Sequence, residues 1–176
     1  MARNLLTVFL LIAARAFGQD TTPPTIQCID PSGVVGNSCK FTLPDYTASV
    51  VASDDSGMVT VMQSPAPGTV LSGTNGADLT FTATDPSNNT VSCTGHLTLT
   101  DTTKPAIVVC ATSAVVNLNG SCTAVVPNLV AQVIATDNCG APFISQSPVA
   151  GTVISAGTNV AITATDGAGN TATCVA

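Results

Sequence analysis

Three kinds of side chain in this sequence offer chemistry: seven cysteines, ten acidic residues that are all aspartate, and a single histidine. Cysteines at this density favour disulfide bridges in an exported protein. Aspartate carboxylates are hard oxygen ligands of the kind that Ca²⁺ prefers. His96 is the only histidine, which disfavours a His-based catalytic triad and a His-containing zinc site of the usual kind. We therefore expect a protein that is not an enzyme.

Composition indicates strands rather than helices. Val, Ala, Thr and Ile carry most of the apolar character, and Glu and Trp are absent. Branched side chains pack well on a pleated sheet and lose rotamer freedom in a helix. The formal net charge of −6 argues against nucleic acid and anionic membrane surfaces as partners.

Residues 1–18 have the layout of a secretory signal peptide. Arg3 stands in a short positive start, an apolar run covers residues 5–14, and the small residues Ala16 and Gly18 follow. A run of this length is too short to remain as a membrane span. We predict cleavage after Gly18, with cleavage after Ala16 as the alternative, and a secreted protein, extracellular or at the cell surface.

The remaining sequence consists of two copies of one unit. "QSPAPGTV" at 63–70 returns as "QSPVAGTV" at 146–153, and "TFTATDPSNNTVSC" at 80–93 returns as "AITATDGAGNTATC" at 161–174. The offset between equivalent residues stays between 81 and 83, which indicates a tandem duplication. The predicted domains are therefore residues 19–100 and 101–176.

Each unit has the pattern of a small all-β domain. Leu79, Phe81 and Ala83 alternate with threonines, which predicts one buried and one solvent-facing side. Short strands separated by turn signals favour a β-sandwich. In the first unit we expect them at 25–28, 39–43, 47–52, 58–63, 79–84 and 90–100.

Three motifs recur in both units: an opening Asp-x-x-x-Pro-x-Ile, a central Gly-Thr-Val and a closing stretch such as "TATDGAGNTATC". With these motifs, residues 20–176 resemble the hyalin repeat (HYR) domain family. The resemblance implies two tandem immunoglobulin-like β-sandwich domains with a role in cell adhesion or the extracellular matrix. The units depart from the family at Ile29 and Ala111, where it usually has proline, and at 71–72 and 154–155, where it usually has Phe-Pro.

Cysteine positions in the two units suggest a pairing scheme. Cys28–Cys93 and Cys110–Cys174 would each link the first strand of a unit to its last. Cys122–Cys139 would be an additional bridge within the second unit, because the first unit has serine in place of Cys139. Other connectivities remain open. Cys39 is then left as a buried thiol, a bridge to another chain or a reactive nucleophile.

Calcium is the one cofactor that the sequence suggests. Asp101 lies where the two units meet, and Asp137 and Asp166 follow in the second unit, with equivalents near Asp54 and Asp85. A cation bound at such a junction can stiffen tandem domains. Aspartate is also a favourable turn residue, so a purely structural role stays open. Asn88 and Asn119 begin two sequons and are candidate glycosylation sites of a glycoprotein.

The last strand of the second unit is shorter than its equivalent. The first unit continues after Cys93 with "TGHLTLT", whereas the second ends in "CVA", so we predict an incomplete strand. One interpretation is a longer array of repeats. The other is strand donation by another molecule, with residues 19–27 of a second copy as the natural donor.

These observations favour a non-catalytic extracellular structural or adhesive protein, a rigid disulfide-stapled surface or matrix element. One alternative is a subunit of a self-assembling filament joined by strand donation. Another is a secreted carbohydrate-binding module, although aromatic residues make up only 3% of the chain. The expected partners are other protein chains, including copies of itself head-to-tail, with no membrane span.

Overall fold

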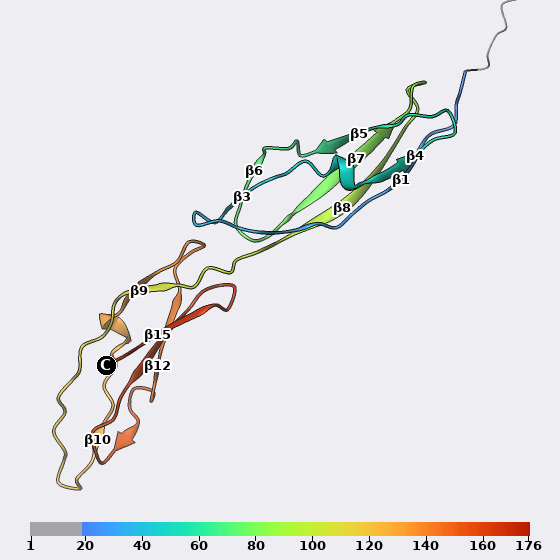
Figure 1. The fold of residues 1–176 in the computed structure, drawn as a ribbon. Coiled ribbons are helices and arrows are strands. Elements are labelled where there is room, and N and C mark those ends of the chain that lie inside the picture. The colour runs from blue at the N-terminus through green and yellow to red at the C-terminus, as the bar shows by residue number, and fades with distance from the viewer. Residues whose placement is uncertain (1–18) are drawn as a thin grey trace, which may run out of the picture.

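The computed structural model describes residues 19–176, so the predicted signal peptide lies outside the described residues. This part of the chain is all-β, as predicted, with two short 3₁₀ turns and no α-helix. Within residues 19–176, no helical segment has the length and apolar character needed to cross a membrane. Strands pair only within two separate units, which Figure 1 shows lying end to end.

The first unit is built around a four-stranded sheet of order β2-β8-β7-β5, in which β2 runs parallel to β8 and the other neighbours are antiparallel. Two smaller antiparallel ladders, β1-β4 and β3-β6, complete it. Its elements are β1 Thr25–Gln27, β2 Ser32–Val34, β3 Lys40–Thr42, η1 Thr47–Ser49, β4 Val51–Ser53, β5 Thr60–Ser64, β6 Val70–Ser72, β7 Ala77–Thr84 and β8 Thr90–Thr100.

The second unit repeats this plan with fewer strands. A sheet of order β12-β14-β15 is accompanied by the ladders β9-β11 and β10-β13. β15 has five residues where the equivalent β8 has eleven. The elements are β9 Ala106–Val109, β10 Ala124–Val125, η2 Val130–Gln132, β11 Ile134–Thr136, β12 Phe143–Ser147, β13 Val153–Ile154, β14 Ala161–Thr165 and β15 Thr171–Val175.

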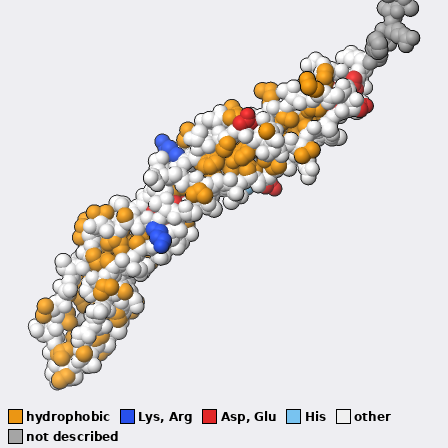
Figure 2. Space-filling model, in the orientation of Figure 1, with side chains coloured by type: hydrophobic (Ala, Val, Ile, Leu, Met, Phe, Trp, Pro, Cys, Tyr) orange, Lys and Arg blue, Asp and Glu red, His pale blue; other side chains and the backbone are white. Residues whose placement is uncertain are grey.

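Each unit buries its own hydrophobic core. Leu79, Phe81 and Ala83 on β7 are fully buried, which confirms the alternation read from the sequence. They pack with buried side chains of β8 and neighbouring segments, and a second cluster centres on Val126 and Ile162. On the face drawn in Figure 2, both units carry exposed apolar side chains and few charged ones. Because each cluster draws on its own unit's strands, each unit has its own source of stability.

Three local features differ from the sequence-based expectation. The strand expected at 47–52 begins as the 3₁₀ turn η1, because the Asp45 carboxylate accepts hydrogen bonds from the backbone N–H and the hydroxyl of Thr47. β2 and β6, of three residues each, lie outside the strands that the sequence predicts. β2 depends on a distant partner, the end of β8, which a local pattern does not reveal.

Candidate metal centres and the junction disulfide

Two disulfides close the units internally. Cys28 is bonded to Cys93 and Cys110 to Cys174, with sequence separations of 65 and 64 residues. In each unit the bridge ties the end of the first strand to the last strand. These are the two bonds that the repeat alignment predicts.

The third disulfide joins the two units. Cys39 of the first unit is bonded to Cys139 of the second, 100 residues along the chain, with their Cα atoms 4.8 Å apart. The predicted Cys122–Cys139 bridge is therefore wrong, and so is the expectation that Cys39 is a free or intermolecular thiol. The physical reason is that Cys139 packs against the core cluster of the first unit rather than toward Cys122.

Cys122 is the free cysteine of the described residues and is exposed. Its local structure matches that of Cys39: both have positive φ, 54° and 53°, at the end of equivalent tight turns. In each turn the cysteine N–H donates to a backbone oxygen three residues back, Asn119 O and Gly36 O, at 2.9 Å. The two cysteines thus share their backbone conformation, but only Cys39 has a partner sulfur opposite it.

A polar contact accompanies the junction disulfide. The side-chain amide of Asn138 donates to the backbone oxygen of Gly36 in the first unit at 3.1 Å, and to Asp101 Oδ1 at 3.2 Å. Asn138 and its neighbour Cys139 therefore both touch the first unit. The loop that carries them is the part of the second unit that fixes the junction.

Directly at this loop, Asp101, Asp137 and Asp166 converge. Each offers one carboxylate oxygen, and these atoms all lie within 4.8 Å of one another. Asp101 and Asp166 are buried, with 5% and 7% of their surface exposed. The three residues come from the inter-unit segment, the loop after β11 and the turn after β14. The structure thus brings together the three carboxylates that the sequence named as calcium candidates.

Hydrogen bonds fix the orientation of these carboxylates. Asp101 Oδ1 accepts from the backbone N–H of Thr103, and Asp137 Oδ2 from that of Cys139, both at 2.9 Å. Asp166 Oδ1 accepts from two backbone N–H groups, and its Oδ2 accepts from the side chain of Asn170 at 2.8 Å. The site is therefore held by the fold rather than assembled from mobile side chains.

The first unit contains the same arrangement. Asp20, Asp54 and Asp85 also place carboxylate oxygens within 4.8 Å of one another. Asn89 binds Asp85 Oδ2 at 2.7 Å, as Asn170 binds Asp166. Asp85 is buried, whereas Asp20 and Asp54 are partly exposed. The sequence analysis did not name Asp20 as a member of this set. Its position is equivalent to that of Asp101 in the repeat, and this equivalence could have identified it.

Electrostatics favour the charged form of two of these carboxyls. Burial raises the pKa of Asp166, but hydrogen bonds from the side chain and backbone of Asn170 and from neighbouring N–H groups outweigh it, so the net pKa lies below the usual 3.8. The backbone N–H of Thr22 likewise lowers the pKa of Asp20. Both groups are anionic at neutral pH.

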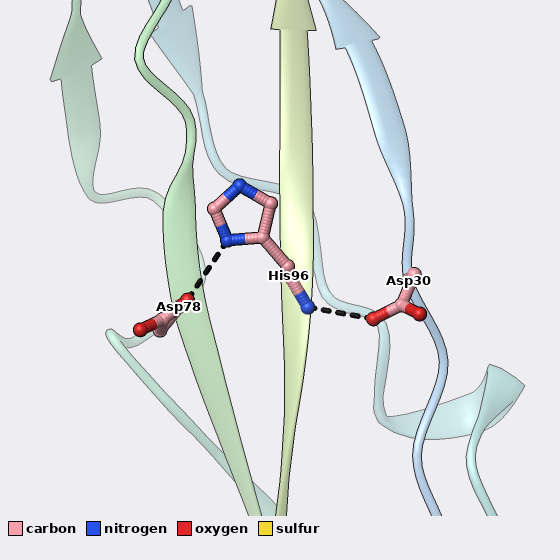
Figure 3. A network of polar contacts seen from close by, with 3 residues as sticks. All are labelled: Asp30, Asp78 and His96. Carbon is pink, nitrogen blue, oxygen red and sulfur yellow. Dashed lines mark hydrogen bonds and ion pairs between the residues drawn. The ribbon is translucent and has the colours of Figure 1, made fainter.

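His96 takes part in an exposed polar network (Figure 3). Its Nδ1 lies 2.8 Å from Asp78 Oδ1, and its backbone N–H donates to Asp30 Oδ1 at 2.7 Å. The close approach of residues 29–30 to β8 requires glycine at position 95, because a Cβ there would lie 1.8 Å from the backbone oxygen of Ile29. The network ties the segment before β2 to the central strand β8.

Both sequons lie on the surface. Asn88 is exposed in the turn between β7 and β8 and has a positive φ of 70°. Asn119 is exposed too, and its side-chain oxygen accepts from the backbone N–H groups of Ser121 and Thr123. Their use as glycosylation sites stays a prediction.

A scan against protein-family models finds no match for this chain, and a search of curated proteins also finds none.

Proposed function

We propose that this chain is a non-catalytic extracellular structural element in which two tandem immunoglobulin-like modules, residues 19–100 and 101–176, form a stiff rod with an adhesive or matrix role. The Cys39–Cys139 disulfide carries the proposal, because it locks the two units to each other.

Two further observations support this proposal. All three disulfides are intramolecular, and stable disulfides are typical of oxidising, extracellular environments. The contact of Asn138 with Gly36 adds a second, non-covalent restraint beside the disulfide. Because both restraints join the same turn of the first unit to the same loop of the second, they limit the relative motion of the two modules.

The experiment is small-angle X-ray scattering of the mature protein, without added metal, beside a C39S/C139S variant. We expect the native protein to scatter as a narrow extended particle. The variant should show a broader distribution of intramolecular distances, because the junction becomes a flexible linker. Identical profiles for the two proteins, or a compact native particle, would contradict the rod.

A filament subunit is a second candidate, favoured by one observation. The second unit has a cavity of about 310 Å³ whose lining combines apolar residues, among them Val126, Leu129 and Val160, with the polar Ser113, Thr158 and Asn159. In the first unit the equivalent edge is covered by the long end of β8 with its buried Leu97 and Leu99. An extended segment of a second copy would fill this edge by strand donation. Electron microscopy of the secreted protein decides: fibres support this candidate, and isolated rods support the spacer.

A further inference from the structure

We propose that Asp101, Asp137 and Asp166 bind one Ca²⁺ ion at the junction, and that this ion fixes the loop through which the second unit holds the first. The inference deepens the proposed function, since the ion would stiffen the same rod. It depends on buried oxygens without hydrogen-bond partners as well as on the grouping of acidic residues.

Several buried oxygens at this site have no hydrogen-bond partner among the described residues. They are Asp101 Oδ2, Asp137 Oδ1 and Asn138 Oδ1. Leaving a buried acceptor unsatisfied costs free energy, and more so when it is charged. Only 5% of the surface of Asp101 is exposed, so bulk water does not supply a hydrogen bond to its Oδ2. Asp101 and Asp137 belong to the carboxylate cluster, so a cation bound there would supply the partner that Asp101 Oδ2 and Asp137 Oδ1 lack.

Charge balance points the same way. Three carboxylates within 4.8 Å of one another repel strongly, and repulsion grows as surrounding water is removed. Within residues 19–176, the structure records one ion pair, between His96 and Asp78, and neither residue belongs to this cluster. Among the described residues, no lysine is recorded in direct ion-pair contact with the junction carboxylates, and a divalent cation would provide such a contact.

The donor set selects the ion. All the available ligands are oxygens, and Cys139 is held in a disulfide, which disfavours the transition metals that prefer sulfur and imidazole. Ca²⁺ binds oxygens at about 2.3–2.6 Å, so ligands on opposite sides of it lie up to about 5 Å apart. Mg²⁺ demands shorter bonds and near-ideal octahedral geometry. Oxygens that all lie within 4.8 Å of one another fit around one Ca²⁺, whose flexible coordination tolerates carboxylates that the fold already holds in place.

The duplicated cluster strengthens the argument. Asp20, Asp54 and Asp85 form the same group in the first unit, and Asp20 Oδ2 is again a buried oxygen with no partner among the described residues. This cluster is more exposed than the one at the junction. We therefore expect two Ca²⁺ sites, of which the junction site binds more tightly.

Binding at the junction reaches the first unit through adjacent residues. Asp137 precedes Asn138, which donates to Gly36 O, and Cys139, which is bonded to Cys39. An ion that holds Asp137 against Asp101 restrains this whole loop. Ca²⁺ should therefore protect the junction disulfide as well as raise thermal stability.

The test uses mature protein stripped of metal with EDTA, in a D20N/D54N background that leaves the junction cluster intact. We expect calorimetric titration with CaCl₂ to show one site with a Kd of about 0.1–1 mM, as in other extracellular modules, and MgCl₂ to bind more weakly. In 5 mM CaCl₂ the Tm should rise by about 3–8 °C. Mild reductant should cleave Cys39–Cys139 several-fold more slowly.

D101N and D137N, made in the same background, should abolish the binding heat and the Tm rise. D55N is the matched control, because Asp55 is exposed and lies outside both clusters. Mass measurement without reductant establishes that each variant retains its three disulfides. Absence of any Ca²⁺ effect on the parent protein overturns the inference, and so does binding that persists in D101N and D137N. The scattering experiment on C39S/C139S is performed without metal, so the rod can stand if the calcium site fails.

Discussion

At the residue scale, equivalent positions of the two units make the same local contacts and then meet different surroundings. Cys39 and Cys122 adopt the same left-handed conformation in equivalent turns of the two units. Cys39 is nevertheless bonded across the junction, whereas Cys122 is an exposed thiol. Asp45 and Asn128 both accept a hydrogen bond from the backbone N–H two residues on, one as a charged group and one as a neutral group. Such pairs serve as internal controls.

The first prediction concerns Cys122. Iodoacetamide added to the native, unreduced protein should modify one thiol per chain, because the other six cysteines are bonded and this one is exposed. Peptide mapping should place the label at residue 122. C122S should remove the label and leave the Tm unchanged, whereas C39S should expose Cys139 as a second reactive thiol. Labelling of Cys139 in the native protein would contradict the junction bond.

The second prediction concerns acid stability at η1. The N–H and hydroxyl of Thr47 lower the pKa of Asp45 below the usual 3.8, so the folded protein favours the carboxylate. Its contribution to the free energy of unfolding is therefore present above about pH 4 and is lost as the pH falls through the folded pKa. D45N should flatten the dependence of Tm on pH between about 5 and 2, since an amide oxygen still accepts the bond.

The equivalent position in the second unit, Asn128, allows the opposite substitution to be tested. N128D places a carboxylate before Val130 at the equivalent turn of the second unit, where the neutral amide now accepts at 3.1 Å. That variant should gain acid sensitivity where D45N loses it. An unchanged pH profile in both variants would show that the Asp45 carboxylate does not contribute to stability.

At the element scale, one glutamine in each unit joins neighbouring strands and turns, Gln63 being buried and Gln146 partly buried. Gln63 on β5 accepts from the backbone N–H of Tyr46 at 2.8 Å and donates to the backbone oxygens of Pro44 and Pro65. Gln146 on β12 makes the corresponding three bonds in the second unit. These side chains bond backbone groups that have no partner strand where the chain turns. Gln63 can therefore be polar at 8% exposure, because its amide oxygen and nitrogen are both hydrogen-bonded.

The third prediction follows from this arrangement. Q63M keeps the approximate side-chain volume but leaves three partly buried backbone groups without their partner. We expect the free energy of unfolding to fall by about 2–3 kcal/mol, measured by chemical denaturation. Q27M, at an exposed position on β1, is the control and should be close to neutral. Equal stability of Q63M and native protein would show that water replaces these bonds.

At the scale of the whole molecule, two independent cores are joined by one covalent bond and a narrow polar contact. The core clusters belong to separate units, and Cys139 alone among the second unit's side chains is recorded against the first cluster. Stability therefore resides within units, whereas their relative orientation depends on the junction. Disulfide variants should therefore change the stability of a unit and the relative orientation of the units separately.

The fourth prediction tests that separation. Removing Cys110–Cys174 in C110S/C174S should destabilise the second unit by about 4 kcal/mol by loop-closure arithmetic and produce two thermal transitions in calorimetry. C39S/C139S should retain the circular dichroism of the native β-structure, because the buried residues of each cluster come from that cluster's own unit and the bond lies at the edge of the first. A single transition in the first variant would show that the units unfold together and that the cores are coupled.

The sequence by itself determined the all-β class, the duplication, the buried face of β7 and the Cys28–Cys93 and Cys110–Cys174 bonds. Each of these depends on local alternation or on comparison of one unit with the other. It also named Asp101, Asp137 and Asp166 together, because repeat positions mark equivalent turns. The convergence of those carboxylates and the unpartnered state of their oxygens needed coordinates.

Only the tertiary structure decided the partner of Cys39, the short strand β2 and the free state of Cys122. These features depend on how segments distant in sequence are placed, and for Cys39 on how one folded unit meets the other across 100 residues. Local propensity holds no information about that placement, since the equivalent turns at Cys39 and Cys122 end in a disulfide in the first unit and a free thiol in the second. The physical reason is that docking of the units, rather than chain conformation near either cysteine, brings the two sulfur atoms within bonding distance.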